Sequence, residues 1–292
     1  MERGDPMLHP HVLREDIAGL GSLQYTMLDV EFAQLSDPGR VRDHNEDYLG
    51  YVYPATAGEM RSHGCLFVLA DGVGGHDKGE VASRTAVESI LAGFRGASPG
   101  EPHSPLLSRL VQTANTRVME AGMAASSGGI PMATTLVSCG LRYDRALVAH
   151  VGDSRCYLVR RGEAVVLTRD HTLVGDQMRL GLLSAREAAD SPHRHLLSRS
   201  LGAEMFVNVE SNEYQILADD VLVLCSDGLH GAVSPSEIAA IVSHQADLNA
   251  AAQRLVAVAN HQDGTDNISV QLIRVRSVER VGMYRGRPYR LR

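Results

Sequence analysis

Short apolar runs that border an aspartate recur along this chain and constrain its fold more than any other feature. The runs CLFVLA, ALVAHV and DVLVLC lead into Asp71, Asp153 and Asp227, and Asp266 precedes a fourth run, ISVQLI. Apolar stretches rich in β-branched residues and bounded by turn residues predict buried strands. If these strands lie side by side, the carboxylates meet at one sheet edge, although they are far apart in the sequence.

A group of carboxylates in one place needs cations to neutralise it. An Asp-Gly pair after a strand is also ordinary turn chemistry, so one such pair alone would be structural. Four acidic strand ends in one chain are harder to explain as turns. Ligands that are all oxygen favour hard ions such as Mg2+ or Mn2+. The pattern therefore predicts a metal centre suited to phosphate-ester chemistry.

Composition narrows the class of protein. The chain has 292 residues, 44% of them hydrophobic, and a formal net charge of -7, which argues against nucleic acid as the main partner. The four cysteines lie in or beside apolar strand patterns without a CxxC pair, so reduced thiols are expected. No apolar run reaches the length of a membrane span, and no signal-peptide pattern opens the sequence. We expect a cytoplasmic monomer that does not insert into membranes.

The order of predicted elements indicates the fold class. Two groups of consecutive strands, each followed by two helices, and a last strand favour an α+β fold. We predict a four-layer α-β-β-α sandwich, in which two antiparallel sheets pack face to face with helix pairs outside. The predicted strands cover 25–34, 48–53, 66–70, several segments within 132–168, 207–214, 221–225 and 268–275, and the predicted helices cover 79–92, 106–124, 235–242 and 248–259.

Three regions lie outside this regular pattern. Residues 1–24 show no clear periodicity and are predicted to be a flexible N-terminal extension to a domain spanning 25–275. Residues 170–198 are polar and irregular and form a predicted flap, where loops often set substrate choice. Residues 276–292 carry several arginines, and we expect a basic, solvated tail, with a docking segment as the alternative.

The stretch that runs from Arg42 to Asp47 adds a candidate phosphate site. Arg42 precedes the acidic pair Glu46 and Asp47 by a few residues. A guanidinium offers forked donors that match phosphate oxygens, and the acidic pair can hold a metal or its waters. A solvated surface turn would have the same composition, so the interpretation depends on the strand-end aspartates lying nearby.

Eight ordered segments give the chain a family resemblance. They are VRDHNEDYLG, VLADGVGGHDKGEVAS, MATTLVS, VAHVGDSRCYLV, TRDHTLV, LSRSLG, VLCSDGLHGAVS and GTDNISV. Their order and spacing over residues 25–275 resemble the metal-dependent Ser/Thr protein phosphatases of type 2C. The DGVGGH form of the second segment indicates the bacterial branch. One departure is Ala133 in MATTLVS, where the family usually has glycine; alanine is tolerated unless φ is positive there.

The resemblance implies a role for each site residue. It implies two tightly bound Mn2+ or Mg2+ ions and a third, weaker one. Arg42 would grip the substrate phosphate, and Asn267 would orient the ligands from behind. The implied metal ligands are Asp71 as the bridge, the carbonyl of Gly72, Asp227 and Asp266, with Glu46 and Asp47 acting directly or through waters, and Asp153 at the weaker ion.

The same resemblance implies hydrolysis by a hydroxide that bridges the two ions, without a covalent phosphoenzyme. The leaving alkoxide then needs a proton. His76, close behind Asp71, is the candidate general acid, because imidazole titrates near neutral pH; a metal-bound water is the alternative donor. We interpret His171 as structural, because it follows a strand and can fix a turn. His193 and His195, in the flap, are expected to be surface residues.

Three functions from different classes are compatible with these features. The first is a phosphatase of phosphoserine and phosphothreonine in proteins, whose partners are phosphoproteins and a cognate Ser/Thr kinase. The second is a non-catalytic relative that only binds a phosphoprotein; such proteins lose metal-binding aspartates, and this chain keeps them. The third is a metal-dependent nuclease or phosphodiesterase, which would need a basic groove that the acidic balance disfavours.

Overall fold

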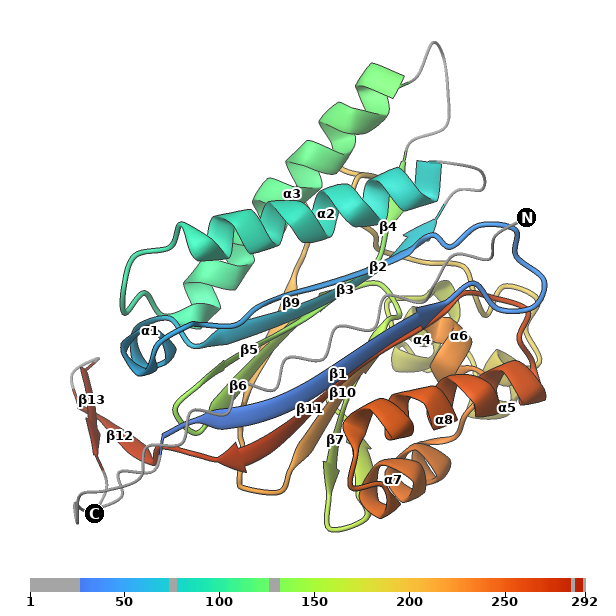
Figure 1. Ribbon diagram of the computed structural model, residues 1–292. Helices are drawn as coiled ribbons and strands as arrows, with labels where there is room; N and C mark the ends of the chain where they lie inside the picture. Colours follow the sequence, from blue (N-terminus) through green and yellow to red (C-terminus); the bar gives the residue numbers. More distant parts are fainter. Residues whose placement is uncertain (1–26, 74–77, 126–131, 285–286, 291–292) are drawn as a thin grey trace, which may run out of the picture.

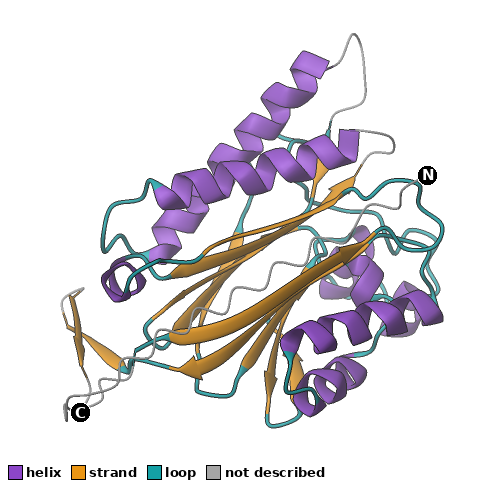
Figure 2. Ribbon diagram, in the orientation of Figure 1, coloured by secondary structure: helices purple, strands orange, loops and turns teal. Residues whose placement is uncertain are grey.

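Two sheets packed face to face, with helices on their outer surfaces, form the body of the protein (Figure 1, Figure 2). The computed structural model describes residues 27–73, 78–125, 132–284 and 287–290. The predicted α+β sandwich is confirmed, including the helix pairs outside the sheets. The predicted extension over residues 1–24 lies outside the described residues.

The first sheet has six strands, and all of its strand pairs are antiparallel. Its strand order is β2-β3-β5-β6-β9, with the short β4 paired to the end of β3. A hairpin connects β5 to β6 directly, as expected for strands without intervening helices. The strands are β2 (Asp47–Val52), β3 (Cys65–Val73), β4 (Ala133–Thr134), β5 (Leu136–Arg142), β6 (Arg145–Val151) and β9 (Glu210–Gln215).

The second sheet has five strands in the order β1-β11-β10-β7-β8, and its pairs are antiparallel as well. A separate hairpin of two short strands follows β11. The sequence predicted no strand after Val275, because that stretch has no apolar alternation. The strands are β1 (Asp29–Asp37), β7 (Arg155–Arg160), β8 (Glu163–Val166), β10 (Val221–Cys225), β11 (Ile268–Ser277), β12 (Val281–Tyr284) and β13 (Arg287–Arg290).

Helices cover the outer face of each sheet. In Figure 1, α2 and α3 lie over the first sheet, and α7 and α8 lie over the second. The predicted flap holds two short helices, α4 and α5, and the sequence did not predict α1 or α6. The helices are α1 (Ala57–Ser62), α2 (Lys78–Arg95), α3 (His103–Ala125), α4 (Leu173–Arg179), α5 (Ala185–Ala189), α6 (Asp227–His230), α7 (Pro235–His244) and α8 (Leu248–Gln262).

The composition of β3 shows why its run is apolar throughout. Leu66 and Val68 point to the helix layer, whereas Phe67 and Leu69 point to the space between the sheets, and all four are completely buried. Successive side chains of a strand face opposite sides, so a strand covered on both faces has no polar side. The same division holds in β10, where Val223 faces the helices and Leu222 faces the other sheet.

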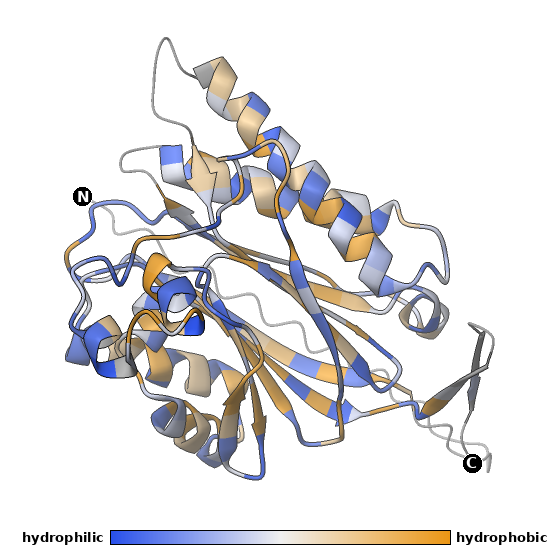
Figure 3. Ribbon diagram, turned by 180° about the vertical axis from the view of Figure 1, so that it is seen from behind, coloured by the Kyte–Doolittle hydropathy of each residue, from blue (hydrophilic) through white to orange (hydrophobic). Residues whose placement is uncertain are grey.

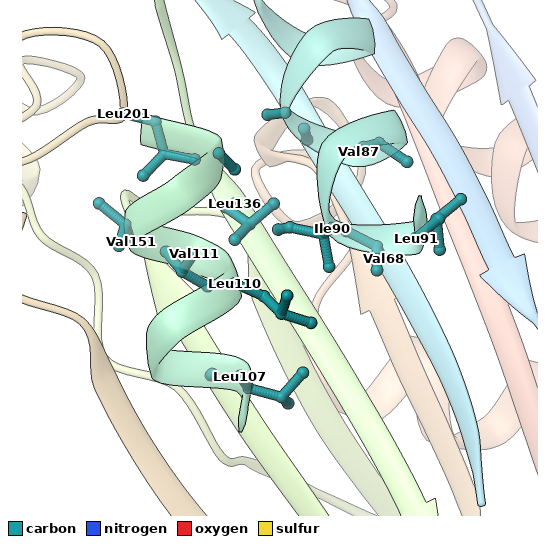
Figure 4. Close-up of a cluster of buried hydrophobic side chains, with 14 of the residues drawn as sticks. Val68, Val87, Ile90, Leu91, Leu107, Leu110, Val111, Leu136, Val151 and Leu201 are labelled. Atoms are coloured by element: carbon teal, nitrogen blue, oxygen red, sulfur yellow. The ribbon is translucent and has the colours of Figure 1, made fainter. Parts of the chain in front are cut away.

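The layers between sheets and helices are closed by aliphatic packing. Val87, Ile90 and Leu91 of α2 meet Val68 of β3 in the core beneath the first helix pair (Figure 4). Hydrophobic and hydrophilic residues alternate around the outer helices, as an amphipathic helix requires (Figure 3). Among the described residues, none of the helices is both long enough and apolar enough to cross a membrane.

Candidate metal centre

The predicted site residues lie at one end of the sandwich, where strands of both sheets finish. Asp47 begins β2 and pairs across the ladder with Asp71, and Asp153 follows β6 of the same sheet. Asp227 follows β10, and Asp266 precedes β11, in the other sheet. The expectation of a single sheet edge was wrong, because the carboxylates meet across two facing sheets. Apolar alternation identifies a strand but not its neighbours.

A cavity of about 420 Å³ opens among these strand ends. The predicted residues contribute most of its wall, and the flap contributes His195, Leu196 and Leu197. Asp47 lies behind the wall rather than in it. The cavity is lined by Arg42, Glu46, Asp71, Gly72, Val73, Thr135, Asp153, His195, Leu196, Leu197, Ser200, Asp227, Asp266 and Asn267.

The main chain at Asp71 is fixed by the two threonines of the MATTLVS segment. The amide of Thr135 and the hydroxyl of Thr134 each donate to the carbonyl of Asp71 at 2.8 Å. The amide of Asp71 in turn donates to the hydroxyl oxygen of Thr135 at 3.1 Å. Ala133 is not among the described residues with positive φ, so alanine fits where glycine was expected. The position of Asp71 therefore does not depend on its own carboxylate.

Two glycines allow Glu46 to approach the end of β3. A Cβ atom on Gly72 would lie 2.2 Å from the carbonyl oxygen of Gly79, and one on Gly79 would lie 2.7 Å from the carboxyl carbon of Glu46. The amide of Gly72 donates to the carbonyl of Glu46 at 3.1 Å, and the hydroxyl of Ser83 donates to it at 2.6 Å. Glycine is needed here because backbone and side chain pass too close for any Cβ.

Asp47 is the most enclosed carboxylate of the group that sequence reasoning identified. Only 6% of Asp47 is exposed; its Oδ2 accepts a hydrogen bond from Ser226 at 2.8 Å, whereas its Oδ1 has no hydrogen-bond partner among the described residues. Burial raises the pKa of Asp47 to about 7, although the hydroxyls of Ser269 and Ser226 oppose the rise. A buried oxygen without a partner is costly, and a cation or its water can supply what is missing.

The pKa values of three other aspartates of the group are raised as well. Burial, followed by repulsion from Asp47 and Asp227, raises the pKa of Asp71 well above its usual range. Burial also raises the pKa of Asp153 to about 7, and burial and Asp266 raise that of Asp227. Acidic groups that hold their protons this strongly are poised for divalent cations, which favour the ionised form. The residues present therefore fit a centre for Mg2+ or Mn2+.

Arg42 is the one arginine among the described residues that line the cavity. Its guanidinium lies 2.9 Å from the carboxylate of Asp266, and both side chains are partly exposed, at 48% and 37%. Burial lowers the pKa of Arg42, but Asp266 and Glu46 raise it more, so the net change is upward. A guanidinium carries five N–H donors, so one contact with Asp266 leaves donors for a phosphate.

Asn267 connects the loop before β2 to the start of β11. Its side-chain amide donates to the carbonyls of Pro38 and His44 at 3.0 and 2.9 Å, and its Oδ1 accepts from the amide of Glu46 at 2.8 Å. The backbone amide of Asn267 donates to Oδ1 of Asp266 at 2.9 Å. The side chain of Asn267 thus holds the backbone of Glu46, and its backbone amide holds the carboxylate of Asp266; both are predicted metal ligands.

Replacing Asn267 by alanine should weaken metal binding. Three hydrogen bonds disappear, so the backbone amide of Glu46 loses its partner, and loss of such supporting contacts typically costs 10–100-fold in metal affinity. The Mn2+ concentration for half-maximal activity should rise by about that factor. Asn260→Ala is the matched control, because Asn260 contacts Asp37 at 3.0 Å and lies outside the cavity. An equal Mn2+ requirement in both variants would contradict this role.

A histidine cluster lies beside the carboxylate cavity. His150 and His171 stack with their ring centres 4.7 Å apart, and ligand atoms of His150, His171 and Glu210 lie within 4.8 Å of one another. The amide of Gly152 donates to Nδ1 of His171, so the neutral ring carries its proton on Nε2, which faces Glu210 at 3.3 Å. Arg169 also donates to Glu210, at 2.6 Å.

This cluster is structural rather than a second metal site. Nε2 of His171, which faces Glu210, carries a proton and therefore has no lone pair to offer a cation. The guanidinium of Arg169 already neutralises the carboxylate of Glu210, so that carboxylate has no net charge left to attract one. Burial lowers the pKa of His171 to about 4. The backbone of His171 also accepts from the amide of Ser198 and donates to the carbonyl of Gly152. His171 thus joins the flap to the residue before Asp153, in keeping with its interpretation as structural.

Some candidates fall elsewhere. His76 lies outside the described residues, so its role as general acid stays a prediction. His195 is exposed, as expected, but it also lines the cavity and partly opposes the rise in the pKa of Asp227, which sequence reasoning missed. Thr135 and Ser200 were missed as wall residues as well. Both residues lie in segments that carry the family resemblance, MATTLVS and LSRSLG. Nothing else in those segments indicates that they reach the site.

The fold and this site define a hydrolase of the metal-dependent class, and comparison with known proteins identifies its family. The protein phosphatase 2C family model matches residues 42–272. The serine/threonine phosphatase stp of Listeria welshimeri is 34% identical over 256 residues, covering 86% of this chain and 96% of the relative.

Solved structures agree with this assignment. The Mycobacterium tuberculosis serine/threonine phosphatase PstP/Ppp has a TM-score of 0.74 and 31% identity, covering 86% of this chain and 100% of that one. A PstP catalytic domain in complex with two manganese ions has a TM-score of 0.71 and 32% identity over the same shares. The chain belongs to the protein phosphatase 2C family and is a bacterial-type protein serine/threonine phosphatase, as the resemblance implied.

Proposed function

We propose that this chain hydrolyses phosphoserine and phosphothreonine in proteins with Mn2+ or Mg2+ as its cofactor, and so reverses the action of Ser/Thr kinases in a bacterial signalling circuit. The observation that carries the proposal is the cavity at the end of the sandwich. Its described wall combines five acidic side chains with the guanidinium of Arg42, and Asp47 lies directly behind it. Such a wall suits cations and a phosphate together, since each neutralises part of the other's charge.

The acidic residues would hold the ions at the places that the family resemblance gives them. When bound, divalent cations neutralise phosphate charge and strongly lower the pKa of a coordinated water. Two ions would bind tightly and a third more weakly. The proposed ligands are Asp71 for both tight ions, the carbonyl of Gly72 for the first, Asp227 and Asp266 for the second, Glu46 and Asp47 directly or through waters, and Asp153 with Asp227 for the weak ion.

Side chains of the protein would do the remaining work on the phosphate ester. Arg42 would bind the phosphate oxygens and offset the charge that develops on them. The hydrogen bond to Asp266 already orients the guanidinium of Arg42 toward the cavity. His76 would protonate the leaving alkoxide, and the sequence supports this role through the short distance along the chain from Asp71 to His76.

The two other candidate functions have less support. A phosphoprotein-binding relative without activity would not need six acidic groups around one cavity, and their repulsion would only destabilise it. A nuclease would need a basic path for the nucleic-acid backbone. The described cavity wall instead has one arginine against five acidic residues.

The proposal includes a place and partners for the protein. Cys65, Cys139, Cys156 and Cys225 are buried and unpaired, which supports a reducing compartment such as the cytoplasm. There the substrates would be phosphorylated proteins, together with the Ser/Thr kinase that modifies them. We propose a monomer as the working unit.

Phosphate release from a phosphothreonine peptide tests the function directly. The purified protein should release phosphate in Mn2+ and none in EDTA. Failure with both Mn2+ and Mg2+, while the protein remains folded, would contradict the proposal and favour a binding role.

Arg42→Ala should raise KM for the phosphopeptide about tenfold or more, because hydrogen bonds to a charged group contribute about 1.5–3 kcal/mol. The change in kcat should be smaller. Arg40→Ala is the matched control, since Arg40 is exposed, lies two residues away and does not line the cavity. If both variants have the KM of the unchanged protein, Arg42 does not bind the phosphate.

A further inference from the structure

A second cavity lies beside the carboxylate cavity, and its walls come from the end of the flap and the segment that follows it. It measures about 340 Å³, and it shares Leu197 and Ser200 with the carboxylate cavity. We propose that this cavity, here called the side pocket, binds a large apolar side chain of the substrate polypeptide a few residues from the phosphorylated residue. The proposal rests on the proposed function, because it places the phosphate in the carboxylate cavity.

The shared wall sets how far the substrate must reach. An extended chain advances about 3.3–3.6 Å per residue, so a polypeptide whose phosphate lies in one cavity enters the other within a few residues. Leu201, beside Ser200, pairs with Thr134, whose hydroxyl donates to the carbonyl of Asp71 at 2.8 Å. The side pocket is therefore held in a defined position relative to Asp71.

The far wall of the side pocket is fixed by two amide side chains of α3. Asn115, completely buried, accepts from the amide of Gly202 and donates to the carbonyl of Glu204, both at 2.8 Å. Gln112 donates to the carbonyl of Met205 at 2.9 Å and accepts from the amide of Val207 at 3.2 Å. An irregular segment held at four backbone positions is preformed, and a preformed pocket binds without an ordering cost.

Phe206 is the most exposed large apolar side chain in the wall of the side pocket, which also holds the polar residues Ser198, Ser200 and Asn208. The exposed fraction of Phe206 is 75%, although the backbone on both sides of it is hydrogen-bonded to α3. Ala203 and Val207 also line the pocket. An exposed aromatic side chain on a rigid backbone next to a reaction site is a typical contact for a binding partner.

The charges of the side pocket favour an uncharged occupant. Arg199 and Glu204 both line it and carry opposite charges. The pocket therefore attracts neither a basic nor an acidic side chain on balance, whereas Leu197, Phe206 and Val207 can cover an apolar one. A leucine or aromatic residue near the phosphorylated position is the substrate feature that fits.

A set of phosphothreonine peptides with one leucine moved through the positions on either side, in an alanine background, tests the side pocket. For the unchanged protein with Mn2+, kcat/KM should rise about tenfold when leucine occupies one or two neighbouring positions on one side only. Phe206→Ala should reduce that preference to less than about twofold. Met205→Ala is the matched control: Met205 is adjacent and 68% exposed but does not line the pocket, so the preference should persist.

Hydrolysis of p-nitrophenyl phosphate, which has no polypeptide chain, separates the two proposals. If the unchanged protein hydrolyses it but has no positional preference among the peptides, or if the preference survives in Phe206→Ala, the side pocket is not a substrate subsite. If the protein hydrolyses neither substrate, the proposed function itself fails. Sedimentation of a dimer that Phe206→Ala dissociates would instead assign the pocket to a second copy of the chain and overturn the inference.

Discussion

Replacing Asp71 by asparagine should lower kcat for phosphopeptide hydrolysis about a hundredfold to a thousandfold. Asp71 lies at the centre of the carboxylate group, where Asp47, Asp227 and Asp153 each raise its pKa after burial does. Asparagine keeps the shape but removes the charge that would hold both tight ions, and removing one well-placed electrostatic group commonly costs 10²–10³ in rate. The fold should persist, because the threonine contacts reach only the main chain at Asp71.

The same substitution should stabilise the protein when no metal is present. Burial and the neighbouring carboxylates make the ionised form of Asp71 costly in the metal-free protein, and asparagine has no such cost because it cannot ionise. For a domain of this size, each kcal/mol gained raises Tm by about 2–4 °C. Asp263→Asn is the control, since Asp263 is exposed and lies outside the cavity. Retained activity, or a metal-free Tm no higher than that of the control, would contradict the central position of Asp71.

The sequence predicted the sandwich because its strands carry strong local signals. In β3 the run from Cys65 to Ala70 is buried on both faces, and only a strand between two covered surfaces needs so many apolar residues in sequence. The capping box of Ser234 and Glu237 and the proline at the start of α7 make that helix start readable as well. These signals depend on neighbours within a few residues.

What depends on distant residues could not be predicted. The contact of Arg42 with Asp266 joins residues more than two hundred positions apart, and no local rule connects them. His195 reaches the cavity wall because the flap folds back over the strand ends. Phe206 belongs to no helix or strand pattern in the sequence. Its position as a fixed, exposed side chain follows only from the contacts of Gln112 with the backbone on both sides of it. Family resemblance supplied roles but not these contacts.

In the metal-free protein, the free energy of unfolding should fall as pH rises from about 4 to above 7. Asp47 and Asp153 have pKa values of about 7 in the folded state, against 3.8 for an ordinary aspartate, and the pKa values of Asp71 and Asp227 are raised too. Between these limits the folded state binds more protons than the unfolded state, so stability decreases with pH. The stability that these protonated carboxyls contribute is fully present below the pKa of the unfolded state. It is lost as the pH rises through the pKa of the folded state.

The expected change in the free energy of unfolding is large enough to measure by denaturation. The difference between about 7 and 3.8 corresponds to about 4 kcal/mol for one carboxyl such as Asp47, as an upper bound. Urea denaturation of metal-free protein between pH 4.5 and 8 should show the unchanged chain losing stability relative to Asp47→Asn, which imitates the protonated form at every pH. A difference that stays constant with pH would contradict the assignment.

Excess Mn2+ should reverse the sign of this dependence. Cations bind the ionised carboxylates, so metal competes with protons for the same oxygens and binds better as pH rises. Stability in Mn2+ should therefore increase over the range in which the metal-free protein loses it. The repulsion among the carboxylates of the metal-free protein then accounts for the metal affinity of the site. The ions relieve the destabilisation that burial and mutual repulsion cause at Asp47, Asp71 and Asp153.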